Sequence, residues 1–480
     1  MRRSDSFMRG NNARQSGPFL ISRRHAALTM LAGLLTGASS VRVLAEAVAP
    51  GGQVSLTAKP KSVLLFTPKG AGAQDGRDWQ NAMPIDALSK SLKAARPGSG
   101  FLIGFDPADG EPAALDQGQI FLKSSGDKDH PLFVEAGLKA GEHKIAAATK
   151  DAVTFFKSSQ PWSLASFGRH GGACYFAIND GASHLRISGF RVDGTPADGF
   201  FKFRAGKGTP LTYVDIAISN IDAKNVGRVI ETDRNAMLQN LVVADCKAVG
   251  VVRGFARFRN LSDSALRNLD LDAANMDAGG KNVCQLIALE AGDNVLFENV
   301  AVRNAMNTPA PKNGKEGYVQ GDGIVCERKT SNVTIRGCKA SNMGDGGFDL
   351  KTTNVTIEDS STDSCKYGAR IWMEGNNVIR RCDFRNPQTR GGANGACIQA
   401  CGTLQIIDTK LQAGPGTAAI SLHKLDKRKD PAVTMQGGSI QLDGDAVVAS
   451  ASTSGVLELR DVMVNGVATS HRYVFEKKEQ

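Results

Sequence analysis

Residues 333–340 read VTIRGCKA, with apolar side chains at the first, third, sixth and eighth positions. The same pattern returns in four clear copies, VLFENVAV (295–302), LRISGFRV (185–192), IAISNIDA (216–223) and LQIIDTKL (404–411). Weaker copies begin at Leu241, Ser264, Val355, Asn377, Val433 and Leu457. Neighbouring copies begin 22 to 38 residues apart. A constant internal pattern with a drifting period indicates one structural unit per repeat, with insertions confined to turns.

The alternation within each repeat predicts β-strands, because successive side chains of a strand point to opposite faces. Nine residues after a repeat start, the chain often carries Asn or Gly, namely Asn225, Asn304, Asn342, Asn386, Gly194, Gly250 and Gly466. These two residue types enter the left-handed backbone region at the least cost. Short strands and one such turn in each repeat predict an all-β fold: a single right-handed parallel β-helix, or solenoid, of about a dozen coils.

The segment before the repeats favours a cap on this β-helix. Residues 76–105 read GRDWQNAMPIDALSKSLKAARPGSGFLIGF, in which an amphipathic stretch from Ile85 to Ala95 precedes Pro97-Gly98 and an apolar strand. A solenoid exposes its core at each end, so we expect an N-terminal cap helix here.

The WQNAM stretch (79–83), this helix, the PG turn and the NVTI repeats resemble the right-handed parallel β-helix proteins of the pectate-lyase-like superfamily, over residues 76–475. That superfamily contains polysaccharide lyases, glycoside hydrolases and epimerases. The resemblance is one of architecture. The N-T-D, D-D, G-H-G and R-I-K set of polygalacturonase-type hydrolases is incomplete, and the D-P-H-D-type motif of mannuronan epimerases is missing.

The N-terminus predicts export. A basic region ends in Arg23-Arg24 and is followed by the apolar run AALTMLAGLLTG (26–37), which is too short to span a bilayer comfortably. The paired arginines resemble a twin-arginine signal, with an ordinary secretory signal or an anchor as the alternatives. We therefore expect a periplasmic or secreted protein with no membrane span in its mature chain. The expected parts are a signal peptide (1–47), a linker (48–75), the capped β-helix (76–475) and a tail (476–480).

Charge and cysteine content narrow the function classes. Half of the net charge of +10 comes from residues 1–47, which carry seven arginines and two acids. The mild charge of the remaining chain does not indicate a nucleic-acid partner. The nine cysteines include no CxxC pair, and export after folding in the cytoplasm would keep them reduced. We expect buried cysteines rather than a disulfide framework.

Beyond the Asn turn, four segments align on a glycine that we assign to a tight turn: Gly323-IVCER, Gly347-FDLK, Gly368-ARIW and Gly395-ACIQ. Alternation then places Val325, Asp349, Arg370 and Cys397 in one outward column, and Glu327, Lys351, Trp372 and Gln399 in the next. Stacked coils lie about 4.8 Å apart, so Asp349 neighbours Arg370 and Glu327 neighbours Lys351. The preceding turns add Asp322 and Asp345.

This charged patch suits a polysaccharide lyase, which neutralises a uronate carboxylate and removes the proton beside it. The candidate catalytic residues are Lys351, Arg370, Asp349, Asp345, Asp322 and Glu327, and the candidate substrate-binding residues are Arg328, Lys366, Tyr367 and Trp372. No cofactor is required by the pattern, but Asp322, Asp345 and Asp349 are also candidate Ca²⁺ ligands.

Other functions fit the same patch. A glycoside hydrolase would use two of the carboxyl groups, and a uronate epimerase or a non-catalytic carbohydrate-binding or adhesin β-helix stays open. Stacked opposite charges also serve as solubilising ladders. The Lys and Arg content favours an acidic polysaccharide partner and lyase-type β-elimination. An enzyme predicts that Asp349, Lys351 and Arg370 converge in one groove without being fully paired, whereas a flat, saturated face favours a binding module.

Overall fold

The computed structural model of the protein describes residues 59–67, 69–105, 114–115, 120–139, 155–156, 174–194, 199–276, 283–307, 319–392, 394–425 and 428–476. Residues 48–480 form one compact unit. The expected signal peptide, most of the linker and the tail beyond Glu476 lie outside the described residues, so these boundaries stay predictions. Within the described part of the chain, no helix is long and apolar enough to cross a membrane.

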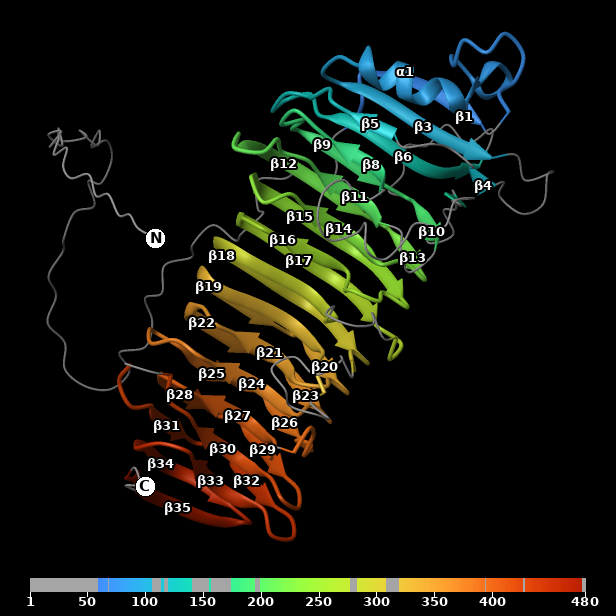
Figure 1. The fold of residues 1–480 in the computed structure, drawn as a ribbon. Helices are drawn as coiled ribbons and strands as arrows, with labels where there is room; N and C mark the ends of the chain where they lie inside the picture. Colours follow the sequence, from blue (N-terminus) through green and yellow to red (C-terminus); the bar gives the residue numbers. More distant parts are fainter. Residues whose placement is uncertain are drawn as a thin grey trace, which may run out of the picture. The chain divides into compact units, whose positions relative to one another are not determined.

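Parallel strands stack coil on coil through the unit, in three ladders (Figure 1). The first ladder contains β1 (Ser62–Thr67), β3 (Ser99–Phe105), β6 (Leu132–Lys139), β9 (Leu185–Ser188), β12 (Leu211–Ser219), β15 (Ala236–Val249), β17 (Leu261–Asp272), β18 (Gln285–Arg303), β19 (Asp322–Arg336), β22 (Thr353–Glu358), β25 (Val378–Arg380), β28 (Thr403–Ile407), β31 (Ala432–Gln436) and β34 (Gly455–Val464). This arrangement confirms an all-β, parallel β-helix fold.

The second ladder contains β4 (Ala114–Leu115), β7 (Phe155–Phe156), β10 (Arg191–Asp193), β13 (Asp222–Lys224), β20 (Lys339–Ser341), β23 (Ser361–Asp363), β26 (Asp383–Arg385), β29 (Lys410–Ala413) and β32 (Ser439–Leu442), with the later parts of β15, β17, β18 and β34. The third contains β5 (Ile120–Leu122), β8 (Cys174–Ile178), β11 (Gly199–Phe203), β14 (Arg228–Thr232), β16 (Ala256–Phe258), β21 (Gly346–Leu350), β24 (Tyr367–Ile371), β27 (Ala396–Ala400), β30 (Ala418–Leu422) and β33 (Val447–Ala451), with the first parts of β18 and β19. At the two ends, β2 (Met83–Pro84) pairs with β1, and β35 (Val467–Phe475) runs antiparallel to β34.

Bends at residues with positive φ separate the ladders. In the coil that contains the repeat at 216–223, these residues are Asp215 (57°), Asn220 (52°) and Asn225 (53°). The turn predicted nine residues after each repeat start is confirmed at Asn225, Asn304, Asn342, Asn386, Gly250 and Gly466. The second bend was not predicted. It falls at the fifth position of the repeat, so the eight-residue pattern turns a corner and its two halves lie in different ladders.

The only α-helix among the described residues, α1 (Leu88–Lys93), lies near the start of the β-helix (Figure 1). It follows the 3-10 turns η1 (Trp79–Asn81) and η2 (Ile85–Ala87). Leu88 and Leu92 are buried in the main core. The helix is shorter than the expected stretch from Ile85 to Ala95, because the chain has left the helical conformation at Ala94. Its role as a cap stays a prediction.

Apolar side chains fill the interior of the coils. Phe176, Phe190 and Phe200 form one aromatic group, with ring centroids 5.2–5.8 Å apart. All nine cysteines are buried and free, which confirms the expectation that no disulfide framework holds this fold. Burial raises the pKa of Cys246 to about 12, so this thiol is not reactive at neutral pH.

Strands of the third ladder break the strict alternation of faces. Consecutive residues such as Phe200 and Phe201 are both buried in the core. In β21 and β24, the first of the two consecutive inward-facing positions is occupied by Gly347 and Gly368, respectively. A Cβ on Gly347 would lie 2.6 Å from the carbonyl oxygen of Gly368. These glycines therefore permit close contact between coils, which corrects their assignment to turns.

Candidate active site

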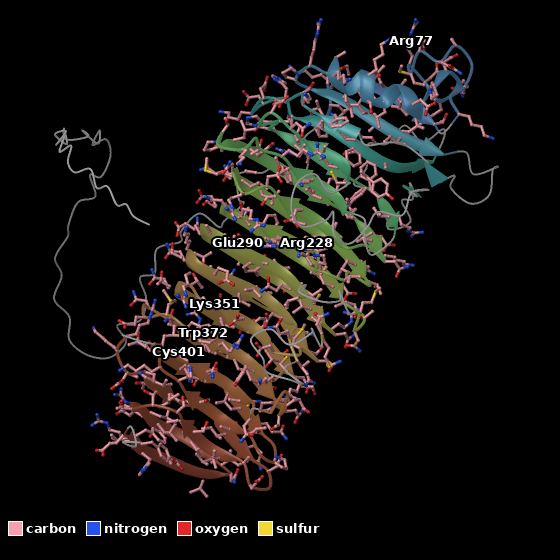
Figure 2. The ribbon with its side chains drawn as sticks, viewed as in Figure 1. Arg77, Arg228, Glu290, Lys351, Trp372 and Cys401 are labelled. Atoms are coloured by element: carbon pink, nitrogen blue, oxygen red, sulfur yellow. The ribbon has the colours of Figure 1, made fainter. Side chains whose placement is uncertain are left out.

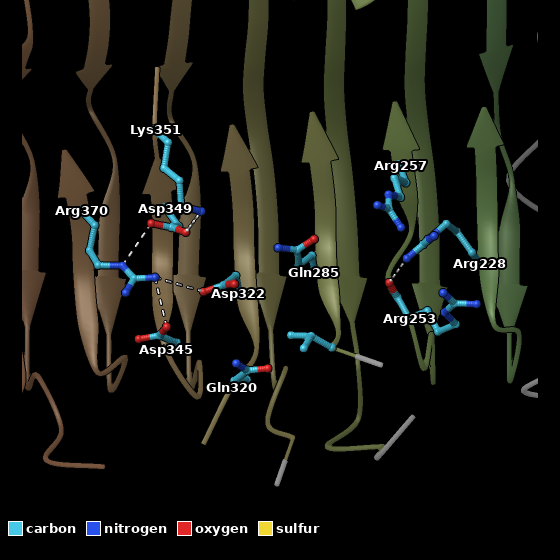
Figure 3. A pocket seen from close by; sticks show the side chains of 11 residues that line it. Arg228, Arg253, Arg257, Gln285, Gln320, Asp322, Asp345, Asp349, Lys351 and Arg370 are labelled. Atoms are coloured by element: carbon cyan, nitrogen blue, oxygen red, sulfur yellow. Dashed lines mark hydrogen bonds and ion pairs between the residues drawn. The ribbon is translucent and has the colours of Figure 1, made fainter. Parts of the chain in front are cut away.

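A pocket of about 360 Å³ lies on the outer side of the third ladder (Figure 3). Its lining residues are Arg228, Arg253, Arg257, Val283, Gln285, Gln320, Asp322, Asp345, Asp349, Lys351 and Arg370. Acidic residues gather with Arg370 and Lys351 at one side, and three arginines form the other side. We call these the acidic wall (Asp322, Asp345, Asp349) and the arginine wall (Arg228, Arg253, Arg257).

Strand register explains why a hollow forms between the walls. Arg257 on β16 pairs with Ala288, Ala288 with Val325, and Val325 with Asp349. The two intervening side chains are short, so they leave the space between the long side chains of the walls unfilled. The walls lie about three coil spacings apart at this position, which is roughly 14 Å.

The acidic wall surrounds the guanidinium group of Arg370. Its Nη2 atom lies 3.0 Å from Asp345 Oδ2 and 3.9 Å from Asp322 Oδ1, and its Nε lies 3.0 Å from Asp349 Oδ1. All four residues are buried. The backbone N–H of Gly346 donates a 2.8 Å hydrogen bond to Asp322 Oδ1. Arg370 on β24 therefore joins carboxyl groups from the two preceding coils, Asp322 on β19 and Asp345 and Asp349 at β21.

Asp349 also has partners of its own. Lys351 Nζ lies 2.8 Å from Asp349 Oδ2 and 3.1 Å from Glu327 Oε1, and the indole N–H of Trp372 donates to Asp349. The predicted convergence of Asp349, Lys351 and Arg370 in one groove is thus confirmed. The expectation that these three residues are not fully paired is wrong, because Asp349 forms ion pairs with both Lys351 and Arg370.

The environment separates the pKa values of two carboxyl groups in this wall. Burial, with the negative charges of Asp349 and Asp345, raises the pKa of Asp322 to about 7. Burial alone would also raise the pKa of Asp349, but Arg370 and Lys351 outweigh it and hold that pKa below its ordinary value. At neutral pH, Asp322 is therefore partly protonated while Asp349 is ionised. General acid–base catalysis by carboxyl groups uses one protonated and one ionised group, as in this pair.

Gly346 provides the space in which this wall assembles. A Cβ at this position would lie 3.1 Å from Asp349 Cβ, 3.3 Å from Asp322 Oδ1 and 3.6 Å from Arg370 Nε. The missing side chain therefore lets both carboxyl groups and the guanidinium approach one another.

Gly346→Ala should displace these groups by a few tenths of an ångström and lower kcat by about ten- to a hundredfold, since small misplacements of catalytic groups are costly. The free energy of unfolding should change by less than about 1 kcal/mol. Gly347→Ala is the matched control, because its methyl group meets the backbone of Gly368 and should cost about 1–3 kcal/mol of stability. Chemical denaturation with an activity assay separates the two effects. Equal loss of stability in both variants would contradict this role of Gly346.

The acidic wall does not fit the Ca²⁺ site considered from the sequence. Its three carboxyl groups already converge on Arg370, whose charge occupies the place of a cation. Among the described residues, no group of three or more His, Cys, Asp or Glu side chains is arranged to hold a metal ion.

The arginine wall was not predicted from the sequence. Arg228 and Arg253 are buried, and Arg257 lies on β16 in the same outward column as Asp349 and Arg370. The sequence did contain a signal for it. Extending the alignment of this ladder towards the N-terminus places GFAR (254–257) in the same register as GGFD (346–349), three coils away.

The other predicted residues flank the pocket rather than line it. Glu327 lies at its edge through the ion pair with Lys351, and Arg328 is exposed on β19. Lys366 is buried, with its Nζ 5.6 Å from the centre of the Tyr367 ring. The guanidinium carbon of Arg370 lies 5.3 Å from the ring centroid of Tyr367 and 5.1 Å from that of Trp372. These two rings hold Arg370 rather than presenting a free stacking platform.

One expected register is wrong. Arg370 pairs with Gln399, not with Cys397, because Tyr367 aligns with Ala396. The turn before β27 is two residues longer than the glycine alignment assumed. Cys397 is consequently buried, and Cys401 follows Trp372 in the column that contains Lys351 (Figure 2).

The fold and its charged pocket define the class of protein: a parallel β-helix with a titratable site on one sheet. Residues 281–425 match the family model described as right handed beta helix region. This match supports the expected resemblance to right-handed β-helix proteins as a likeness of fold over that part of the chain. No curated protein matches the sequence.

Several solved structures are similar in fold. Pectate lyase Pel9A is 13% identical, with 88% of this chain and 84% of that chain covered at a TM-score of 0.44. The polygalacturonase from Erwinia carotovora ssp. carotovora is 12% identical, with 89% and 100% covered at 0.43. The A-module of the mannuronan C-5 epimerase AlgE6 from Azotobacter vinelandii is 12% identical, with 80% and 93% covered at 0.42. At these identities the likeness concerns the fold alone.

Proposed function

We propose that this protein is a carbohydrate-active enzyme that hydrolyses glycosidic bonds of an acidic polysaccharide. The observation that carries the proposal is the pair of carboxyl groups with separated pKa values, Asp322 at about 7 and Asp349 below its ordinary value. Glycoside hydrolases need one protonated and one ionised carboxyl group on either side of the scissile bond.

In this mechanism, protonated Asp322 donates its proton to the glycosidic oxygen as the bond to the sugar carbon breaks. Asp349 is the ionised partner that faces the positive charge developing on the sugar ring and directs a water molecule to its carbon. The hydroxide of that water joins the sugar, and its proton passes to Asp322, which the first step left ionised. Arg370 and Lys351 keep Asp349 ionised throughout.

The β-elimination favoured by the sequence has less support, because its cationic candidates for the general base would have to be deprotonated. Lys351 was a candidate, and burial alone would lower the pKa of its amine. The nearby Asp349 and Glu327 outweigh burial and raise that pKa instead. Arg370 is ion-paired with three carboxyl groups, and a guanidinium group is not deprotonated in proteins. Neither group is therefore available to abstract a proton at neutral pH.

An acidic substrate is retained in the proposal because the pocket carries five cationic and three acidic side chains. Export to the periplasm or medium is also retained. It rests on the arginine pair and the apolar run at residues 23–37, and a polymeric substrate outside the cytoplasm would require it.

The direct test incubates the purified protein with a panel of neutral, uronate-containing and sulfated polysaccharides. Reducing ends and the ultraviolet absorbance of unsaturated sugars are followed together. Hydrolysis predicts new reducing ends without that absorbance. Unsaturated products would replace hydrolysis with the lyase alternative, and no product from any polymer would favour a binding module.

The rate should depend on pH through Asp322. As a general acid it must be protonated, so kcat/KM should fall as pH rises through its pKa of about 7. A pH–rate profile checks this descending limb. Asp359, paired with Arg381 on the surface, offers a control, because Asp359→Asn should leave the profile unchanged. A profile that is flat between pH 6 and about 8.5 would contradict the role of Asp322.

A further inference from the structure

We propose that the arginine wall, with Gln285 and Gln320, is an oxyanion-binding subsite that holds a carboxylate or sulfate group carried by the sugar chain. The inference rests on the proposed function for the identity of the ligand as a carbohydrate. It concerns a different part of the pocket from the one that carries the chemistry, so binding and hydrolysis can fail separately.

Positive charge is in excess on this side of the pocket. Arg228 pairs with Glu231, while Arg257 and Arg259 share Glu290. The single carboxylate of Glu290 therefore serves two guanidinium groups, and the buried Arg253 lines the same wall. Like charges held together at low exposure favour the binding of an anion between them.

The wall is already ordered before any ligand arrives. Arg228 and Arg253 are only 3% and 7% exposed. Arg228 Nη2 donates a 2.6 Å hydrogen bond to the backbone oxygen of Arg253, and Arg257 Nε donates a 2.7 Å bond to Glu290 Oε1. Burial lowers the pKa of Arg253 to about 10, and the charge of Arg228 acts in the same direction. A bound anion would relieve this repulsion without reorganising the side chains.

The two glutamines complete the subsite with neutral polar groups. Gln285 lies between the walls and pairs in register with Asp322 (Figure 3). The amide oxygen of Gln320 is buried and has no hydrogen-bond partner among the described residues, so it can accept from a sugar hydroxyl. Planar guanidinium forks suit the two oxygens of a carboxylate and also those of a sulfate ester.

Spacing separates this subsite from the bond that is cleaved. Arg257 and Asp349 occupy the same outward column, three coils apart. That spacing is roughly 14 Å, which exceeds one sugar unit. The recognised anion would therefore belong to a neighbouring sugar, and the subsite would fix the register of the chain on the enzyme.

The test measures binding without turnover. Asp322→Asn protein is titrated calorimetrically with an oligogalacturonate, a sulfated galactan oligomer and a neutral oligomer of equal length. We expect both anionic oligomers to bind about tenfold or more tightly than the neutral one, less so at high salt. The ratio of the two anionic affinities tells a carboxylate from a sulfate.

A second substitution removes the attraction while keeping the shape of the pocket. Gln285→Glu places a negative charge between the walls and should weaken binding of the anionic oligomers by about tenfold or more. Gln405→Glu makes the same chemical change on the exposed side of β28 and should have no effect. Thermal melts establish that each variant is folded.

Each outcome bears on one claim. Equal binding of neutral and anionic oligomers, or unchanged binding by Gln285→Glu, would overturn the subsite even if the wild-type enzyme hydrolyses a polymer. Anion-dependent binding by a protein that cleaves nothing would support the subsite and remove the proposed hydrolysis.

Discussion

Asp322→Asn is expected to lower kcat by about a hundred- to ten-thousandfold, because an amide cannot supply the proton that the leaving oxygen requires. The substitution keeps the size of the side chain, and the amide oxygen can still accept the hydrogen bond from Gly346. KM should change little, since the proton is needed in the transition state rather than for binding. Steady-state kinetics at pH 6 and 8 provides the measurement.

The same variant should gain stability at alkaline pH. The folded-state pKa of Asp322 is raised to about 7, so the native protein holds a proton that the unfolded chain releases. The wild-type protein therefore loses stability as the pH rises through 7, whereas Asp322→Asn does not undergo this loss. An inactive variant with a higher Tm than wild type at pH 8 is the predicted combination. Activity within a few fold of wild type would exclude Asp322 as the acid.

Arg370→Met should cost about 3–5 kcal/mol of unfolding free energy at neutral pH, the largest stability loss expected in the site. The methionine leaves a buried group of three carboxyl side chains without the cation that joins them. Arg381→Met is the matched control. Arg381 pairs with Asp359 on the surface, where both side chains are about half exposed, so its loss should cost at most about 1 kcal/mol.

The deficit of Arg370→Met should also depend on pH. Arg370 lowers the pKa of both Asp349 and Asp322, so its removal raises both. The variant should therefore lose least unfolding free energy at acidic pH, where protons on the carboxyl groups replace the missing cation. The loss should be largest as the pH rises above 7. Urea denaturation at several pH values measures this slope. A deficit as small as that of Arg381→Met at every pH would show that Arg370 does not hold the acids together.

The repeat made the fold predictable, because few architectures combine strands of alternating apolar residues with a recurrent Asn turn. The pairing of Asp349 with Arg370 and the convergence with Lys351 followed from the same register. These predictions depend only on the two-residue period of a strand and on the spacing of stacked coils.

Three features escaped the sequence for physical reasons. The corner at the fifth repeat position preserves the apolar pattern on both sides, so periodicity alone does not reveal it. The two consecutive inward residues in the third ladder bring Asp322 onto the outer side of the β-helix beside Asp349, where strict alternation would have buried it in the core. The arginine wall lies in coils that precede Gly323, the first of the four glycines on which the segments align, so that alignment does not reach it.

The pKa separation also required the structure. Asp322 and Asp349 are both aspartates in similar sequence contexts, and their difference comes from burial, from the neighbouring carboxylates and from the distance of each to Arg370. Composition identified the candidates, whereas packing assigned their roles.

Hydrolysis by the Asp322–Asp349 pair can be tested by mass spectrometry of the products formed from a uronate polysaccharide in heavy-oxygen water. Each cleavage should add one water molecule, with the label at the new reducing end, and Asp322→Asn should slow this incorporation by about a hundredfold or more. Unlabelled products that carry an unsaturated sugar at the non-reducing end would contradict it.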